Sequence, residues 1–149
     1  MAIREILFRG KRDNRYDQGW TCGVPYYDHE GECIMATDYT RYVVIPETVG
    51  QYIERNDSDK NYIFEDDIVE VTLYSGTKYQ YLIWFNKEMA CREAIEIDDI
   101  RFNGNDYYGN KVEYSDFCLM LQDPYGDVES VKVIGNIHDN PEILKNSNP

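Results

Sequence analysis

The four cysteines and two histidines are the side chains best suited to bind a transition metal or to supply a nucleophile and its base. None of the cysteines forms a Cys-x-x-Cys pair, although structural zinc sites usually contain at least one close pair. A tetrahedral site would require Cys22, His29 and Cys33 to converge with Cys91 or Cys118. Because small apolar thiols are common in protein cores, we expect free cysteines, no metal and no other cofactor.

Two further chemistries have partial sequence support. The segment 57–61 begins like a calcium loop, but its sixth position is Tyr62 instead of Gly and its twelfth is Ile68 instead of Glu. Acid–base catalysis by histidine has only His29 and His138 as candidates, and no local motif pairs either with a cysteine. No glycine-rich phosphate loop is present. We therefore expect no enzymatic activity.

Charge is unevenly distributed along a chain of net charge −13. Residues 1–20 contain five Lys and Arg against three acids, a net charge of +2, while the remainder contains ten against 25, a net charge of −15. An acidic body disfavours nucleic acid, whose binding requires cations that neutralise phosphates. Four basic residues are candidate contacts for nucleic acid or for an acidic partner: Arg9, Lys11, Arg12 and Arg15. Alternatively, Arg9 and Lys11 pair with carboxylates of the body.

Composition places the chain among folded, β-rich proteins. It has 149 residues, 42% hydrophobic and 14% aromatic, with 14 tyrosines, which suit a pleated and half-buried surface. This length predicts a single domain over residues 1–149. The first residues lack the apolar run of a signal peptide, and no apolar stretch approaches the roughly 20 residues that span a bilayer. We expect a cytoplasmic protein with reduced cysteines.

The elements that would position these side chains are mostly short strands. The clearest are residues 68–73 and 78–85, where period-two alternation and an intervening Ser-Gly predict a β-hairpin. We expect a strand at residues 3–8 that stops at residues 9–12, further strands at 20–24, 32–36, 42–45, 117–121 and 131–137, and a strand or short helix at 88–97. Pro25 should end its strand or lie at an edge. Residues 54–61 and 103–110 are expected as loops, 123–126 as a turn, and 141–145 as a helical turn capped by Asn140.

Three ordered motifs resemble those of one protein family. They are Phe8-Arg9-Gly10-Lys11; Thr48 to Tyr52 followed by Ile63 to Val69; and Val133 to Leu144. This order resembles the YopX-like family of phage and prophage proteins, which typically carry FRGK, TVGQYTG, IFEGDIV and VIGNIYENPELL segments. The chain departs at Asp66, where the family usually has Gly, at His138, where it usually has Tyr, and in the loop 53–61, which lacks the family's glycines.

The resemblance implies a mostly β fold with a small barrel-like core and a phage or prophage origin, and it implies no activity. We expect a mainly β protein with minor helix and an SH3-like or barrel-like core, in which the first and last segments close over the hairpin. Asp67 should accept backbone N–H bonds in an acidic turn. Gly50 and Gly135 should allow positive φ or close approach. The motif residues with structural or interaction roles are Phe8, Arg9, Gly10, Lys11, Gly50, Gln51, Tyr52, Asp67, Gly135, Asn136 and Pro141.

Three functions fit this sequence. The first is a non-enzymatic interaction module that binds a protein partner or another copy of itself, since exposed strand edges and tyrosines suit interfaces. The second is an acidic inhibitor that imitates nucleic acid and binds a basic host protein. The third is nucleic-acid binding through the basic N-terminal segment. Nucleic acid is the less favoured class of partner, because the rest of the chain is acidic. No membrane partner is expected.

Overall fold

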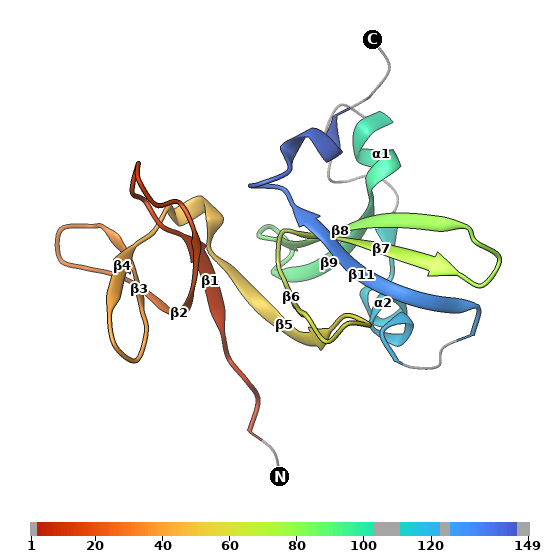
Figure 1. Ribbon diagram of the computed structural model, residues 1–149, viewed down its shortest axis with the longest axis horizontal. Helices are drawn as coiled ribbons and strands as arrows, with labels where there is room; N and C mark the ends of the chain where they lie inside the picture. Colours follow the sequence, from red (N-terminus) through yellow and green to blue (C-terminus); the bar gives the residue numbers. More distant parts are fainter. Residues whose placement is uncertain (1–2, 103–110, 123–125, 146–149) are drawn as a thin grey trace. The chain divides into compact units, whose positions relative to one another are not determined.

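The computed structural model describes residues 3–102, 111–122 and 126–145 (Figure 1). Its chain divides into two compact units, Met1–Glu54 and Arg55–Pro149. Both are built mainly from antiparallel strands, which confirms the predicted mainly β class. The organisation as a single domain stays a prediction.

The first unit is an antiparallel sheet with the strand order β4-β3-β2-β1-β5. Its elements are β1 (Phe8–Lys11), β2 (Trp20–Tyr27), β3 (Cys33–Ala36), β4 (Arg41–Val43), the 3-10 turn η1 (Pro46–Thr48) and β5 (Gly50–Asn56), whose last two residues belong to the second unit. One face of β1 to β4 packs into a small core made by Cys33, Met35 and Val44, against which Phe8, Tyr42 and Val49 are placed.

Two details of this sheet bear on the sequence predictions. The strand predicted at residues 3–8 begins only at Phe8 and includes Arg9 to Lys11, which were expected to end it. Pro25 lies inside β2, so the strand does not end there, and it occupies an edge position, which was the second predicted alternative. The N-terminal half of β2 pairs with β1 and its C-terminal half, from Val24 onward, pairs with β3. Because β1 does not reach Pro25, the proline occupies a locally one-sided strand, where its missing N–H interrupts no second ladder.

The second unit contains a sheet with the order β10-β9-β8-β7-β11. Its elements are β6 (Tyr62–Phe64), β7 (Asp67–Leu73), β8 (Lys78–Asn86), β9 (Cys91–Glu96), α1 (Ile97–Phe102), β10 (Lys111–Val112), α2 (Tyr114–Met120), β11 (Val128–Asn136) and η2 (Pro141–Leu144). The predicted hairpin is confirmed, since β7 and β8 pair from Ile68–Leu82 to Thr72–Lys78.

Both faces of this second sheet are covered by helical elements (Figure 1). On one face Ile68, Leu82 and Ile95 form a buried cluster with Ile97 and Ile100 of α1 and Leu144 of η2. Neighbouring residues on a strand point to opposite sides, so Tyr81 of β8 belongs to the other face. Tyr81 lies 6.4 Å, between ring centroids, from the fully buried Phe117 of α2. The central strands are therefore buried on both sides.

Several local predictions for this unit were wrong. Residues 117–120 belong to helix α2 instead of a strand, and Leu121 is its C-cap, because Tyr114, Phe117 and Cys118 recur at helical spacing and Tyr114 stacks on Phe117. The loop expected at residues 54–61 is shorter, since β5 continues to Asn56. Between the alternatives for residues 88–97, the strand β9 is the one formed. The predicted loop 103–110 and most of the turn 123–126 lie outside the described residues.

The sheets are open and do not close into a barrel, so the predicted barrel-like core is wrong. β11 lies beside β7 as expected, but β1 takes its partners β2 and β5 within the first sheet, so the hairpin is not closed by strands from both ends. An isolated antiparallel bridge joins Arg12, the residue after β1, to Val44, the residue after β4. It does not extend into a continuous ladder between these two strands.

Candidate functional site

The face of strands β1 to β4 that lies opposite the core carries no carboxylate. Because side chains alternate along a strand, the registers of β1 to β4 place ten residues on the side opposite the core. They are Arg9, Lys11, Trp20, Cys22, Val24, Tyr26, Ile34, Ala36, Arg41 and Val43. We call this set the outer face. It holds three cations and no acid in a chain that has 28 acids and 15 Lys and Arg, so its composition differs from that of the chain as a whole.

The outer face is largely accessible. Val24 is 63% exposed, Tyr26 40% and Val43 38%, and Arg41 is also exposed. Ile34, which lies between Tyr26 and Val43, is the buried member of the set, at 8%. Four strands at the usual spacing of about 4.8 Å are about 14 Å wide, so these side chains form one contiguous patch. The sequence prediction missed all of its members except Arg9 and Lys11. Side chains in β2 alternate between the two faces of the sheet, but the outward ones are mostly aromatic or apolar. The sequence therefore shows no alternation of polar and apolar residues that could have identified this face.

A basic and aromatic stack forms one end of the outer face. Lys11 pairs directly with Trp20 across the β1–β2 ladder. The Arg9 guanidinium carbon lies 4.4 Å from the Trp20 ring centroid and the Lys11 ammonium 5.9 Å from it. Cations over an indole ring are attracted by its quadrupole, which holds both side chains against the sheet. Burial raises the pKa of the neighbouring Cys22 thiol, and the charge of Arg9 opposes that rise.

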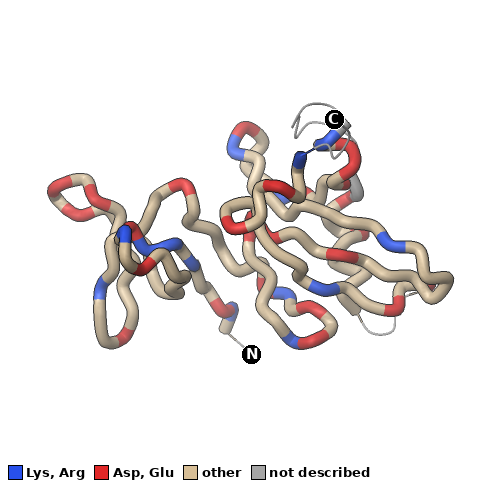
Figure 2. The backbone as a smooth tube through the Cα atoms, turned by 45° about the horizontal axis from the view of Figure 1, so that its top comes forward, with Lys and Arg blue, Asp and Glu red and all other residues tan. Residues whose placement is uncertain are grey.

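The other two predicted basic contacts do not join this stack. Arg12 lies 4.4 Å above the Tyr42 ring and donates to Asp17 at 2.6 Å. Hydrogen bonding from the Gly19 N–H, followed by that from Arg12, lowers the pKa of Asp17. Arg15 is exposed in the following turn, where it stacks on its neighbour Tyr16. In Figure 2 the basic residues of β1 and the turn after it form a nearly continuous run, yet only Arg9 and Lys11 share a face.

The first family motif lies directly beside the second. Phe8 pairs with Gln51 and Arg9 with Gly50, and the Tyr52 N–H donates to the Leu7 carbonyl at 2.8 Å. The hydroxyl of Thr48, a buried residue, accepts the Lys11 N–H at 2.9 Å. A Cβ at Gly10 would lie 3.2 Å from the Val44 Cβ, so a larger residue would crowd the core. These contacts give the two motifs a shared structural role.

The third motif lies beside the acidic turn in the second unit. Asn136 pairs with Asp67, and Asp67 Oδ2 accepts the Phe64 N–H at 2.8 Å, as predicted for the turn. Asn136 Oδ1 accepts two backbone N–H bonds in the turn that follows β11, before Pro141 begins η2. A Cβ at Gly135 would lie 2.5 Å from Asn140 Oδ1, so this glycine permits a close approach. The motif residues thus form two structural clusters, one in each unit.

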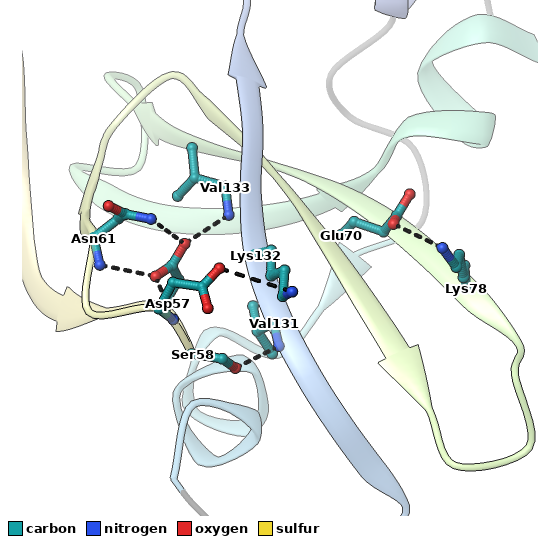
Figure 3. Close-up of polar contacts among 9 residues, drawn as sticks. Asp57, Ser58, Asn61, Glu70, Lys78, Val131, Lys132 and Val133 are labelled. Atoms are coloured by element: carbon teal, nitrogen blue, oxygen red, sulfur yellow. Dashed lines mark hydrogen bonds and ion pairs between the residues drawn. The ribbon is translucent and has the colours of Figure 1, made fainter.

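The calcium-like segment is a structural clamp on β11 (Figure 3). The Asp57 side chain is only 6% exposed and accepts the backbone N–H bonds of Asp59, Asn61 and Val133 at 2.8–3.0 Å. Ser58 exchanges two bonds with Val131, one through its hydroxyl and one through its N–H. Both oxygens of the Asp57 carboxylate already accept hydrogen bonds, so the carboxylate is not available to bind a cation.

The two single-residue departures from the family pattern contact each other. His138 Nε2 lies 2.8 Å from Asp66 Oδ2, and both side chains are mostly buried. Asp66 has a φ of 74°, in the left-handed region that favours glycine and that aspartate tolerates better than most residues. The contact ties the acidic turn to the segment after β11, which explains how a non-glycine residue is accommodated there.

No metal centre is formed among the residues that the structure describes, since no three His, Cys, Asp or Glu side chains cluster within binding distance. All four cysteines are free thiols. Within residues 3–102, 111–122 and 126–145, no helix is long and apolar enough to cross a membrane.

Comparison with known protein families gives a match over most of the chain. The family model described as YopX protein matches residues 11–145, which includes parts of both units and most of the chain. A search of curated proteins finds no significant match. Together with the ordered motifs described above, the match shows that this chain belongs to the YopX protein family.

Proposed function

We propose that this protein is a non-enzymatic interaction module and that the outer face of its first sheet is the contact surface. The observation that carries the proposal is the absence of carboxylates from ten adjacent face positions in a chain of net charge −13. Interface centres are depleted in acids and enriched in Trp, Tyr and Arg, the residues that most often contribute binding energy. Trp20, Tyr26, Arg9 and Arg41 match that composition.

The charge of the face indicates the class of partner. Arg9 and Lys11 at one end and Arg41 at the other border an apolar strip formed by Val24, Tyr26 and their neighbours on β3 and β4. A protein surface with an apolar centre and carboxylates at its margin complements this layout. The partner is an acidic protein, either a host protein or the acidic surface of another copy.

Nucleic-acid binding through the basic segment has weaker support. A phosphate backbone is followed by cations arranged along a groove. Arg12 lies on the opposite side of the strand from Lys11 and is paired with Asp17, so the four predicted contacts do not form such a track.

An acidic inhibitor that imitates nucleic acid is the second candidate, and it rests on the second unit. That unit contains nine Lys and Arg against 19 Asp and Glu, a net charge of −10. In Figure 2 the acids of its described residues lie on several strands and turns instead of in one patch. Its partner would be a basic host protein, and the complex must dissociate as ionic strength rises. A complex insensitive to salt would exclude this candidate.

The family resemblance supports a proposal about the origin of the protein. We propose a phage or prophage origin and a cytoplasmic location in the bacterial host. The FRGK segment and the closing motif support the origin.

The proposed function is tested by reversing charge on the outer face. The triple variant R9E/K11E/R41E is compared with K60E/K87E/K145E, which has the same net charge but changes three exposed lysines of the second unit. Self-association is measured by sedimentation equilibrium, and partner capture from host lysate by quantitative mass spectrometry. Loss of association or of captured partners in the first variant alone supports the proposal. Equal behaviour of both variants, with unchanged far-UV circular dichroism, refutes it.

A further inference from the structure

A second surface of the first unit is a small pocket walled by tyrosines and prolines. Its volume is about 210 Å³, and it is lined by Pro25, Tyr26, Tyr27, Cys33, Pro46 and Val49. These residues come from β2, β3 and the segment of η1, so three separate parts of the chain form the pocket. Most of the lining atoms are apolar.

The exposure of the tyrosines is unusual for a core-building role. Tyr27 is 66% exposed and Tyr26 40%, while Cys33 on the pocket floor is only 6% exposed. Tyr27 pairs with Cys33 at the end of the β2–β3 ladder, where no further strand covers it. Because neighbouring side chains on a strand point to opposite sides, the Tyr27 ring shares the side of Cys33 and stands at the mouth of an apolar depression that accepts a flat apolar side chain.

Carboxylates flank the pocket in the chain. Glu47 follows the lining residue Pro46 and is exposed. The turn between β2 and β3 adds Glu30 and Glu32, both exposed. Asp28 in the same turn uses one carboxylate oxygen to accept the N–H groups of these two glutamates. The turn is thus ordered and presents its remaining acids to solvent.

We propose that this pocket binds a proline-rich segment of a partner protein that carries a basic residue beside its prolines. A polyproline II segment is pre-extended and loses little entropy on binding, and aromatic-lined grooves recognise it through the flat faces of its rings. The flanking carboxylates complement a neighbouring Lys or Arg. The pocket shares Tyr26 with the outer face, but its other lining residues lie outside that face. The inference therefore holds whether or not the outer face binds an acidic protein.

The test uses the full chain and a fluorescein-labelled ten-residue peptide that has two prolines two residues apart and a flanking arginine. Fluorescence anisotropy should saturate as protein is added. Replacing both prolines by alanine should weaken binding at least about tenfold, and replacing the arginine by glutamate should weaken it further as the flanking carboxylates repel the new charge. If the peptide fails to bind at millimolar protein, or the alanine peptide binds equally well, the inference is overturned.

Matched variants locate the binding. Tyr27→Ala should reduce affinity about tenfold, whereas Tyr39→Ala, which removes a 98% exposed tyrosine from the β3–β4 turn, should leave it unchanged. Glu47→Gln should reduce the preference for arginine over glutamate in the peptide, while Asp38→Asn should not. Circular dichroism checks that both proteins are folded. If the Tyr27→Ala variant then binds the peptide as tightly as the unsubstituted chain, the peptide binds elsewhere and the assignment is refuted.

Discussion

Removing the Asp57 carboxylate should destabilise the second unit more than any change to an exposed acid. The carboxylate is buried and accepts three backbone N–H bonds as well as the Asn61 side-chain amide. Each buried donor left without a partner costs about 1–3 kcal/mol, and water will satisfy part of this set, so Asp57→Ala should cost about 3–5 kcal/mol. Asp57→Asn keeps one acceptor oxygen and should cost about 1–2 kcal/mol.

The two tryptophans make this effect measurable unit by unit. Trp20 lies in the first unit and half-buried Trp84 in the second, where its indole N–H donates to Glu93. In a Trp20→Phe background, urea unfolding followed by fluorescence reports the second unit alone. With an m-value of about 1 kcal/mol/M for a unit of this size, Asp57→Asn should lower the midpoint by about 1–2 M.

The matched control is Asp59→Asn. Asp59 belongs to the same turn, but its carboxylate is exposed and only 3.8 Å from the Lys132 ammonium, a surface pair of about 0–1 kcal/mol. If Asp57→Asn and Asp59→Asn shifted the midpoint equally, the clamp on β11 would contribute nothing beyond surface charge. The structural reading of this segment would then be wrong.

Three further predictions concern other contacts. A double-mutant cycle of Asp66→Asn and His138→Phe should give a coupling of about 1–2 kcal/mol in urea unfolding, and additive effects would contradict the contact. Gly23→Ala should destabilise the first unit by more than about 2 kcal/mol, read from Trp20 in a Trp84→Phe background, because the new Cβ would lie 2.1 Å from a carbonyl of β3; an unchanged midpoint would contradict that approach. Burial, and then the two carboxylates that begin α1, raise the pKa of Glu96. The folded state therefore binds this proton more tightly than the unfolded state, the second unit should gain stability as pH falls through the folded pKa, and Glu96→Gln should remove that gain.

The β7–β8 hairpin was predictable because its pattern is local. Val69, Val71 and Leu73 alternate with Glu70 and Thr72, and the turn after them is marked by Ser-Gly. Asp67 was predictable for the same reason, since its acceptor role involves a backbone N–H three residues away. Where the deciding interaction lies within a few residues, the sequence is sufficient to identify it.

Helix α2 shows how a local pattern can mislead. The run from Phe117 to Leu121 is continuously apolar or sulfur-containing and fits a buried strand as well as a helix. The deciding contacts are those of Phe117 with Tyr114, one helical turn before it, and with Tyr81 on a strand far away in sequence. Only the second sheet reveals which face must be covered.

The outer face could not be predicted because it is a property of strand registers. Arg41 becomes a neighbour of Ala36, and Ala36 of Val24, only through two ladders whose registers no local motif specifies. A shift of one residue in β2 would turn Trp20, Val24 and Tyr26 into the core and expose its small residues. The packing opposes that shift, because a Cβ at Gly23 would lie 2.1 Å from the Ala36 carbonyl oxygen of β3, which leaves no room for a larger inward residue there. The packing on one side of the sheet therefore determines which acid-free surface the other side presents.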